Sequence, residues 1–125
     1  MANSIVVVTP PDDILQDGYR ILCVGLEVDE SQIVSDIVKE SKHNNIIIYI
    51  ADILDPTWVI DKKQKSDLIV FNANMEDRTL VGYLAAQGNS FYFGTLKTIA
   101  YANNRAIYTG DQLLTFMEDD KSSNE

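Results

Sequence analysis

The chain has 125 residues, of which 46% are hydrophobic and only three are proline, so it fits one compact domain with a single core. Nineteen acidic residues against ten basic ones give a formal net charge of −9. This charge argues against direct binding to nucleic acid, which depends on clustered Lys and Arg, and it favours solubility.

Cysteine usage and the start of the chain indicate a compartment. Cys23 is the only cysteine and lies in an apolar run, so no internal disulfide can form and a buried structural thiol is expected. The first residues carry no basic segment, and no apolar run approaches the roughly 20 residues of a membrane span. We expect a soluble cytoplasmic protein with no membrane partner.

The first half of the chain predicts two strands and a helix. Ser4–Val8 is β-branched and short, and Arg20–Leu26 is a continuous apolar run typical of a strand buried on both faces of a parallel sheet. Asp29–Lys42 has apolar residues at helical spacing, with Asp29 and Gln32 as an expected N-cap pair. This segment is predicted to be a crossover helix.

The second half continues the alternation of strands and helices. We predict a strand at Ile46–Ile50 and then a helix opened by Asp55 and Pro56, with Lys62, Lys63 and Lys65 at its solvated end. A strand at Asp67–Asn72 follows, and after it a helix that is capped by Asp77, packs Leu80, Val81 and Leu84 inward and stops at Gly88. The remaining predicted elements are a strand at Ser90–Phe93, a helix at Leu96–Tyr101, a strand at Arg105–Tyr108 and a helix at Asp111–Met117.

This order of elements predicts the fold class. We expect a doubly wound α/β domain over residues 1–117, with a mainly parallel five-stranded sheet flanked by helices in a flavodoxin-like or Rossmann-like three-layer arrangement. Residues 118–125 are polar and acidic, and we expect them to form a disordered tail.

Two adjacent segments, 66–74 and 79–89, carry a family resemblance. The first is Ser-Asp followed by an apolar run and Asn-Ala-Asn, and the second contains Thr-Leu-Val-Gly-Tyr-Leu-Ala-Ala. Together they resemble the C-terminal half of the nucleoside 2-deoxyribosyltransferase-like family, in which a Glu on this helix is the covalent nucleophile. This chain has Leu80 or Gly82 at that position, and neither can attack a sugar.

The resemblance has further implications. It implies a homo-oligomer, with Phe91, Tyr92, Phe93 and Tyr101 as aromatic residues suited to its interface. It also implies that an acidic residue before the 67–72 strand holds a nucleobase, and Asp61 is the nearest acid. The small size and altered site resemble those of a virus-encoded accessory protein.

Candidate ligand-binding residues follow from the fold, because doubly wound sheets bind ligands outside the carboxyl ends of their strands. The residues at these ends are Gly25, Glu27, Asp52, Asp55, Asn72, Asn74, Glu76 and Asp77. Their carboxylates suit a glycosyl-transfer or Mg²⁺ site, although helix capping and solvation also explain them. Too few Cys and His residues are present for a zinc site, no glycine-rich phosphate loop is present, and no cofactor is expected.

Three functional hypotheses remain from the sequence. The first is a non-catalytic relative of the family that acts as an interaction or regulatory module, with a protein partner. The second is an enzyme that cleaves N-glycosidic bonds of nucleosides or nucleotides, with Glu76 or Asp77 replacing the missing nucleophile. The third is a sensor that binds a nucleotide without turnover.

Overall fold

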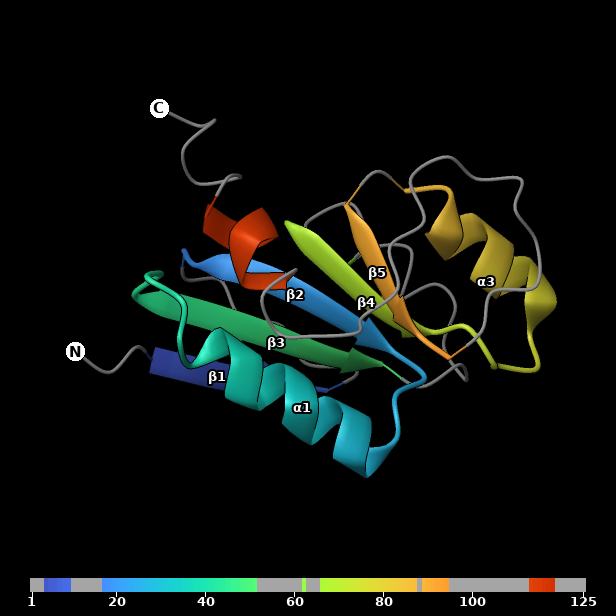
Figure 1. Cartoon of the computed structure of the whole chain (residues 1–125), viewed down its shortest axis with the longest axis horizontal. Helices are drawn as coiled ribbons and strands as arrows, with labels where there is room; N and C mark the ends of the chain where they lie inside the picture. The colour runs from blue at the N-terminus through green and yellow to red at the C-terminus, as the bar shows by residue number, and fades with distance from the viewer. Residues whose placement is uncertain are drawn as a thin grey trace.

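The computed structural model describes residues 4–9, 17–51, 62, 66–87, 89–94 and 113–118 (Figure 1). Within these ranges the elements follow one another as β1 (Ser4–Val8), β2 (Tyr19–Val24), α1 (Val28–Val38), β3 (Asn45–Ala51), β4 (Leu68–Asn72), α3 (Arg78–Ala85) and β5 (Ser90–Phe93). Residues 113–118 are also helical.

The five strands form one sheet in the order β1-β3-β2-β4-β5, and every neighbouring pair is parallel. In the registers, Ile21 of the central strand β2 lies beside Ile48 of β3 and Leu68 of β4. The central strands are apolar on both faces, as a parallel sheet covered on both sides requires. The predicted doubly wound α/β fold is confirmed.

Helices cover the two faces of the sheet separately. On one face, α1 contributes Val34 and Val38, and the helical segment 113–118 contributes Leu113 and Met117 (Figure 1). On the other face, α3 packs its buried side chains against the sheet, and these are Leu80, Val81, Leu84 and Ala85. The protein therefore has three layers, with an apolar cluster on each side of the strands.

Element boundaries differ from the sequence expectation at the start of α1. The strand expected to reach Leu26 ends at Val24, because Gly25 has a φ of +69° and turns the chain. Glu27 is then the N-cap, and its amide donates a hydrogen bond of 2.9 Å to Glu30 Oε1. The expected N-cap pair of Asp29 and Gln32 is therefore wrong, since the helix begins before it.

The burial of Lys62 also differs from the sequence expectation. Its side chain is expected to be solvated, but it is only 3% exposed. Its Nζ lies 5.5 Å from the centroid of the Tyr49 ring, over which the Arg20 guanidinium also lies. Arg20 additionally donates a hydrogen bond to the Tyr49 hydroxyl. The aliphatic stem of a lysine packs as an apolar group while its charge is attracted to an aromatic face, which accounts for the burial.

The last described segment is attached to the rest of the domain by polar contacts. Glu118 closes it, and Oε1 of this residue accepts a hydrogen bond of 3.1 Å from the amide of Lys42. The His43 ring lies 3.1 Å from the Met117 carbonyl through Nε2. Several predicted features lie outside the described residues: the Asp55 and Pro56 helix start, Lys63, Lys65, Gly88, and the elements at 96–101 and 105–108.

Candidate functional site at the carboxyl end of the sheet

The order of the described strands creates a topological switch point between β2 and β4. From β2 the chain crosses through α1 to β3 on one side, whereas β4 lies on the other side of β2 and leads through α3 to β5. The loops after β2 and β4 therefore leave in opposite directions, and a crevice is expected between their carboxyl ends. We refer to the place where Gly25 faces Asn72 as the switch-point crevice.

Asn72 spans this crevice with its side chain. Its Nδ2 donates a hydrogen bond of 3.2 Å to the Gly25 carbonyl, and its Oδ1 accepts one of 2.9 Å from the Asn74 amide. Neighbouring amides are also paired, since Gly25 donates to Ala51 and Ala73 donates to Phe93. The Asn72 side chain, which is predicted to bind a ligand, is therefore hydrogen-bonded within the protein.

Met75 fills the space beside Gly25. A Cβ added at position 25 would lie 2.3 Å from Met75 Sδ, and Met75 is only 7% exposed. Because Gly25 also has a positive φ, glycine is required here for two independent reasons. An apolar side chain thus occupies the volume in which a ligand would approach the backbone.

The two candidate catalytic carboxylates lie just before α3. Asp77 is the N-cap, as predicted, and its Oδ1 accepts a hydrogen bond of 3.0 Å from the Leu80 amide. Glu76 is exposed, and its carboxylate makes no hydrogen bond or ion pair with the described part of the chain. Arg78 holds the preceding loop through its Nη1, which donates hydrogen bonds to the carbonyls of Ala73 and Met75.

The remaining predicted ligand-binding residues divide into two groups. Asn74 is exposed and lies next to Gly94, where an added Cβ would be 2.6 Å from its Nδ2. Asp52, Asp55 and Asp61 lie outside the described residues, so the expected cluster of carboxylates around the crevice is not tested.

The expected positions of the family nucleophile lie on α3. Leu80 is 7% exposed and belongs to the apolar cluster beneath the helix, together with Leu84. Gly82 is half-buried on the same helix. Neither position offers a group that could form a covalent bond to a sugar.

The first turn of α1 carries acidic side chains beside the crevice. Glu27, Asp29 and Glu30 surround the helix start, and Asp29 Oδ1 accepts a hydrogen bond of 3.0 Å from the Glu30 amide. A helix N-terminus attracts anions through its free amides, but these carboxylates already interact with it and repel a phosphate.

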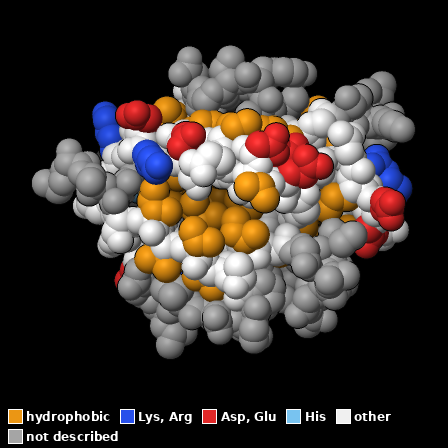
Figure 2. All heavy atoms as spheres, turned by 90° about the horizontal axis from the view of Figure 1, so that it is seen from below, with side chains coloured by type: hydrophobic (Ala, Val, Ile, Leu, Met, Phe, Trp, Pro, Cys, Tyr) orange, Lys and Arg blue, Asp and Glu red, His pale blue; other side chains and the backbone are white. Residues whose placement is uncertain are grey.

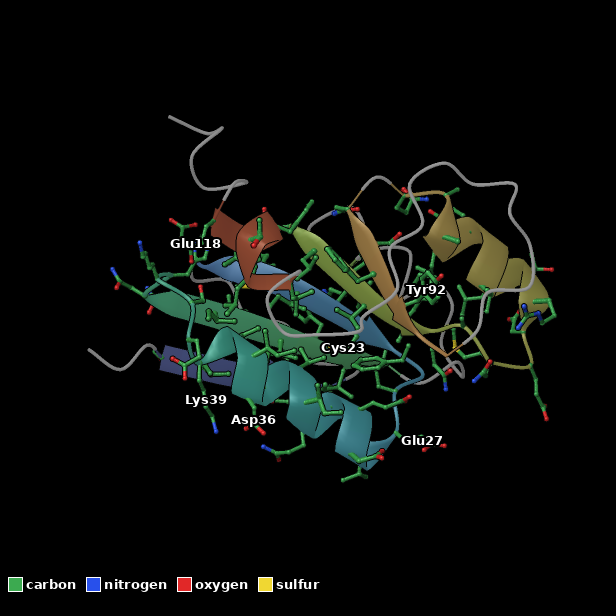
Figure 3. The ribbon with its side chains drawn as sticks, in the orientation of Figure 1. Cys23, Glu27, Asp36, Lys39, Tyr92 and Glu118 are labelled. Carbon is green, nitrogen blue, oxygen red and sulfur yellow. The ribbon has the colours of Figure 1, made fainter. Side chains whose placement is uncertain are left out.

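Cys23 lies two residues before the crevice, inside the apolar cluster that α1 covers (Figure 3). Burial raises the pKa of its thiol to about 12, so the thiol is protonated at neutral pH and does not act as a nucleophile. Among residues 4–9, 17–51, 62, 66–87, 89–94 and 113–118, no three His, Cys, Asp or Glu side chains are grouped to hold a metal ion. No helix in these ranges is long and apolar enough to cross a membrane.

Two residues at the crevice were not recognised from the sequence. Met75 and Arg78 shape the loop after β4, but neither belongs to a motif for chemistry or for a turn. A usable signal was Gly25 directly after an apolar strand, because a glycine there predicts a positive φ and a close neighbour.

The interface expected from the resemblance differs from the structure at β5. Phe91 is 2% exposed and makes an edge contact with Phe116, with ring centroids 5.5 Å apart. Phe93 and Tyr92 are partly buried and pack against the two apolar clusters. Phe91 is therefore a core residue and not an interface residue, while Tyr101 lies outside the described residues.

Comparisons with known proteins give no family for this chain. No protein-family model matches it, and no curated protein matches its sequence.

Proposed function

We propose that this protein is a non-catalytic relative of the nucleoside 2-deoxyribosyltransferase-like group that works as an interaction or regulatory module and self-associates. The observation that carries the proposal is that the switch-point crevice is closed by the protein's own side chains. Asn72 donates a hydrogen bond to the Gly25 carbonyl, and Met75 packs beside them. Leu80 at an expected nucleophile position adds support, since it is buried in the core.

The roles of the carboxylates at the crevice also support a non-catalytic protein. An enzyme of this class needs one carboxylate that faces the sugar carbon and a second acid that protonates the leaving base. Asp77 uses its carboxylate to cap α3, and an N-cap residue that left this bond would uncover the Leu80 amide. The side chains of Asn72 and Asp77 thus make hydrogen bonds that stabilise the fold.

A direct assay tests this proposal. Purified protein is incubated with a panel of nucleosides and deoxynucleotides, and released base and exchanged base are separated by chromatography. We expect neither product above the level of a buffer control. Saturable base release or base exchange would overturn the non-catalytic assignment.

The second candidate is an N-glycosidic-bond enzyme that uses Glu76, and one observation favours it. Glu76 is exposed, follows β4 and has no partner within the described ranges, so its carboxylate is available to a substrate. If the assay detects base release, Glu76→Gln should abolish it. Asp77→Asn is the matched comparison, because Asn caps a helix about as well as Asp and should leave the fold intact.

The sensor hypothesis is separated from both by thermal unfolding. A ligand that binds only the native state stabilises it by about 2.7 kcal/mol at a concentration 100 times its dissociation constant. We expect no such stabilisation with nucleosides or nucleotides. A concentration-dependent rise in Tm without base release would favour the sensor over the module.

A further inference from the structure

An open apolar groove lies on the α1 face of the sheet, between this helix and the edge strand β1. Its volume is about 350 Å³, and its apolar walls are formed by Val7, Leu26, Val28, Ile48 and Ile50. Val28 is 89% exposed and Val7 is 58% exposed, and they are the most exposed large hydrophobic side chains within the described ranges. We refer to this surface as the α1 groove, and removing it from water would be favourable.

The edge strand beside the groove has backbone groups that point away from the sheet. Among the described strands β1 pairs only with β3, and on that side the Ser4 amide donates to the Asn44 carbonyl at 2.8 Å. Because backbone groups alternate in direction along a strand, those of Ile5 and Val7 point outward, where no described residue bonds to them. β1 also lacks charged residues and proline, which commonly protect an exposed edge.

The same residues join this edge to the groove. The Val7 side chain lines the groove, and Ile5, two positions earlier, packs against the apolar cluster on the α1 face. A strand added beside β1 would continue the alternation of the sheet, so every second side chain of that strand would lie on the α1 face next to Val7. A helix in the groove would cover its apolar walls but would leave the outer amides of β1 without new partners. The edge therefore favours an extended segment.

Acidic side chains flank the groove on the side of α1. Val28 lies between Glu27 and Asp29, and both acids are exposed. Farther along the helix, the exposed Asp36 accepts a hydrogen bond of 3.0 Å from Gln32, a polar residue of the groove wall. Figure 2 shows acidic side chains next to the apolar patch on this side of the molecule. The groove therefore combines apolar walls with an acidic rim.

Lys39 at the end of α1 does not offset these acids. It pairs with Asp36 at 3.5 Å (Figure 3), and the exposed Glu40 follows it. A second copy of this chain would bring the same acids to the groove, and the phosphates of a nucleic acid or an anionic lipid would be repelled. A basic partner is attracted instead, and the net charge of −9 adds to this attraction at long range.

We propose that the α1 groove binds an extended segment of a partner protein in which apolar residues occupy every second position and Lys or Arg residues flank them. The segment adds to the sheet beside β1, where its backbone pairs with Ile5 and Val7. Its apolar side chains enter the groove, and its basic side chains meet the acidic rim. Main-chain pairing supplies affinity, and the pattern of side chains supplies specificity. The inference rests on the proposed function, because it names the class of partner that the interaction module binds.

A designed peptide tests the proposal by fluorescence anisotropy with the full chain. The labelled probe has about eight residues, with valine at every second position, serine between the valines and arginine at both ends. We expect a dissociation constant on the order of 100 µM that rises with added salt, because the acids of the rim are exposed. The same peptide with glutamate at both ends should bind at least roughly tenfold more weakly. Absence of saturable binding by the arginine peptide would overturn the proposal.

Hydrogen exchange tests whether the peptide pairs with β1. At a peptide concentration about ten times the dissociation constant, the amides of Ile5 and Val7 should exchange roughly tenfold more slowly. The Val6 amide points toward β3 and should change little, which makes it the internal control. A peptide N-methylated at every amide keeps its side chains but cannot donate hydrogen bonds, and we expect it not to bind. Binding without protection of Ile5 and Val7 would contradict the addition of a strand.

Substitutions test the location of the site. Val7→Lys should weaken the arginine peptide roughly tenfold or more, because it places a charge in the apolar wall. Ile33→Lys adds the same charge and should have little effect, since Ile33 is 44% exposed on α1 but does not line the groove. Asp36→Lys should weaken binding of the arginine peptide and strengthen binding of the glutamate peptide.

Circular dichroism establishes that each variant is folded. If Val7→Lys fails to fold, Asp36→Lys and the exchange measurement on the wild type decide, since Asp36 is exposed on the helix. Undiminished binding to folded Val7→Lys would place the peptide on another surface and overturn the proposal. The nucleoside assay is independent of these results, so base release by a chain that also binds the arginine peptide would refute the non-catalytic assignment and leave the groove as a binding site.

Discussion

The switch-point crevice and the α1 groove belong to the same sheet and differ in how many of their groups already have partners. At the crevice, Asn72 is bonded to Gly25 and Met75 fills the space beside them. At the groove between α1 and β1, Val7 and Val28 lie exposed to water beside β1, whose outer edge pairs with no other described strand. At the position where this fold usually binds ligands, the groups therefore already have partners within the protein, whereas the apolar side chains at the groove do not.

Thiol reactivity should show the largest contrast between these regions. Because burial raises the pKa of Cys23 to about 12, its thiolate fraction near pH 8 is roughly a thousandfold below that of an exposed thiol. We expect maleimide to label native Cys23 correspondingly slowly. Val28→Cys in a Cys23→Ala background should react at the rate of a free thiol when the protein is dilute.

The opposite result would change the comparison. Fast labelling of native Cys23 would mean that the sheet opens next to the crevice, and a crevice that opens could still admit a ligand. Labelling after addition of denaturant is the control, because the same thiol must then react rapidly.

Gly25→Ala should cause the largest loss of stability at the crevice. A non-glycine residue in the left-handed region costs about 1–2 kcal/mol, and displacing the buried Met75 adds to this, for a total of about 2–4 kcal/mol. Gly94→Ala is the matched variant, since its φ is +92° but its neighbour Asn74 is exposed and can turn aside. Denaturant unfolding at equal protein concentration measures both, and equal losses would contradict the packing of Met75.

Asn72→Ala should destabilise the protein by about 1–3 kcal/mol. The substitution removes the donor to the Gly25 carbonyl and the acceptor of the Asn74 amide, and it leaves both groups without these partners. If Asn72 served a ligand instead, its removal would leave stability nearly unchanged and would abolish ligand binding. Urea unfolding distinguishes the two roles.

Asp77→Ala should cost about 1 kcal/mol, the typical value of an N-cap side chain. Glu76→Ala should change the free energy of unfolding by less than about 0.5 kcal/mol, because the Glu76 side chain is exposed and unbonded within the described ranges. A large effect of Glu76→Ala would show that this residue contributes to the fold and would remove the reason to consider it for catalysis.

The strands were the part of the fold most open to sequence prediction. Ser4–Val8 and Ser90–Phe93 agree residue for residue with β1 and β5, because short β-branched or aromatic runs between turn residues have few other uses. The order of the strands was not predictable, since it depends on which edges meet in space. The burial of Lys62 was not predictable for the same reason, because its partner Tyr49 belongs to β3, a separate element of the fold.

The candidate site shows the same division between local and distant information. Asp77 was recognised as a cap because its role involves only the next three residues. Asn72 was recognised as a strand-end residue, but its bond to Gly25 joins two segments that lie far apart in the sequence. A sequence pattern identifies which groups can make hydrogen bonds, whereas the pairing of β2 with β4 decides which bonds they make.

The place of β1 in the sheet has a consequence for how the protein is made. Ser4–Val8 leave the ribosome before any other described segment, yet β3 is the only described strand that pairs with them, in a register that sets Ser4 beside Asn45. The nascent chain must therefore carry this uncharged, β-branched strand without its partner β3 until β2, α1 and β3 have been synthesised. Because long-range pairing forms late, β1 is expected to join a nearly complete unit, and delays in translation before Ala51 would prolong the exposure of this segment to other nascent chains.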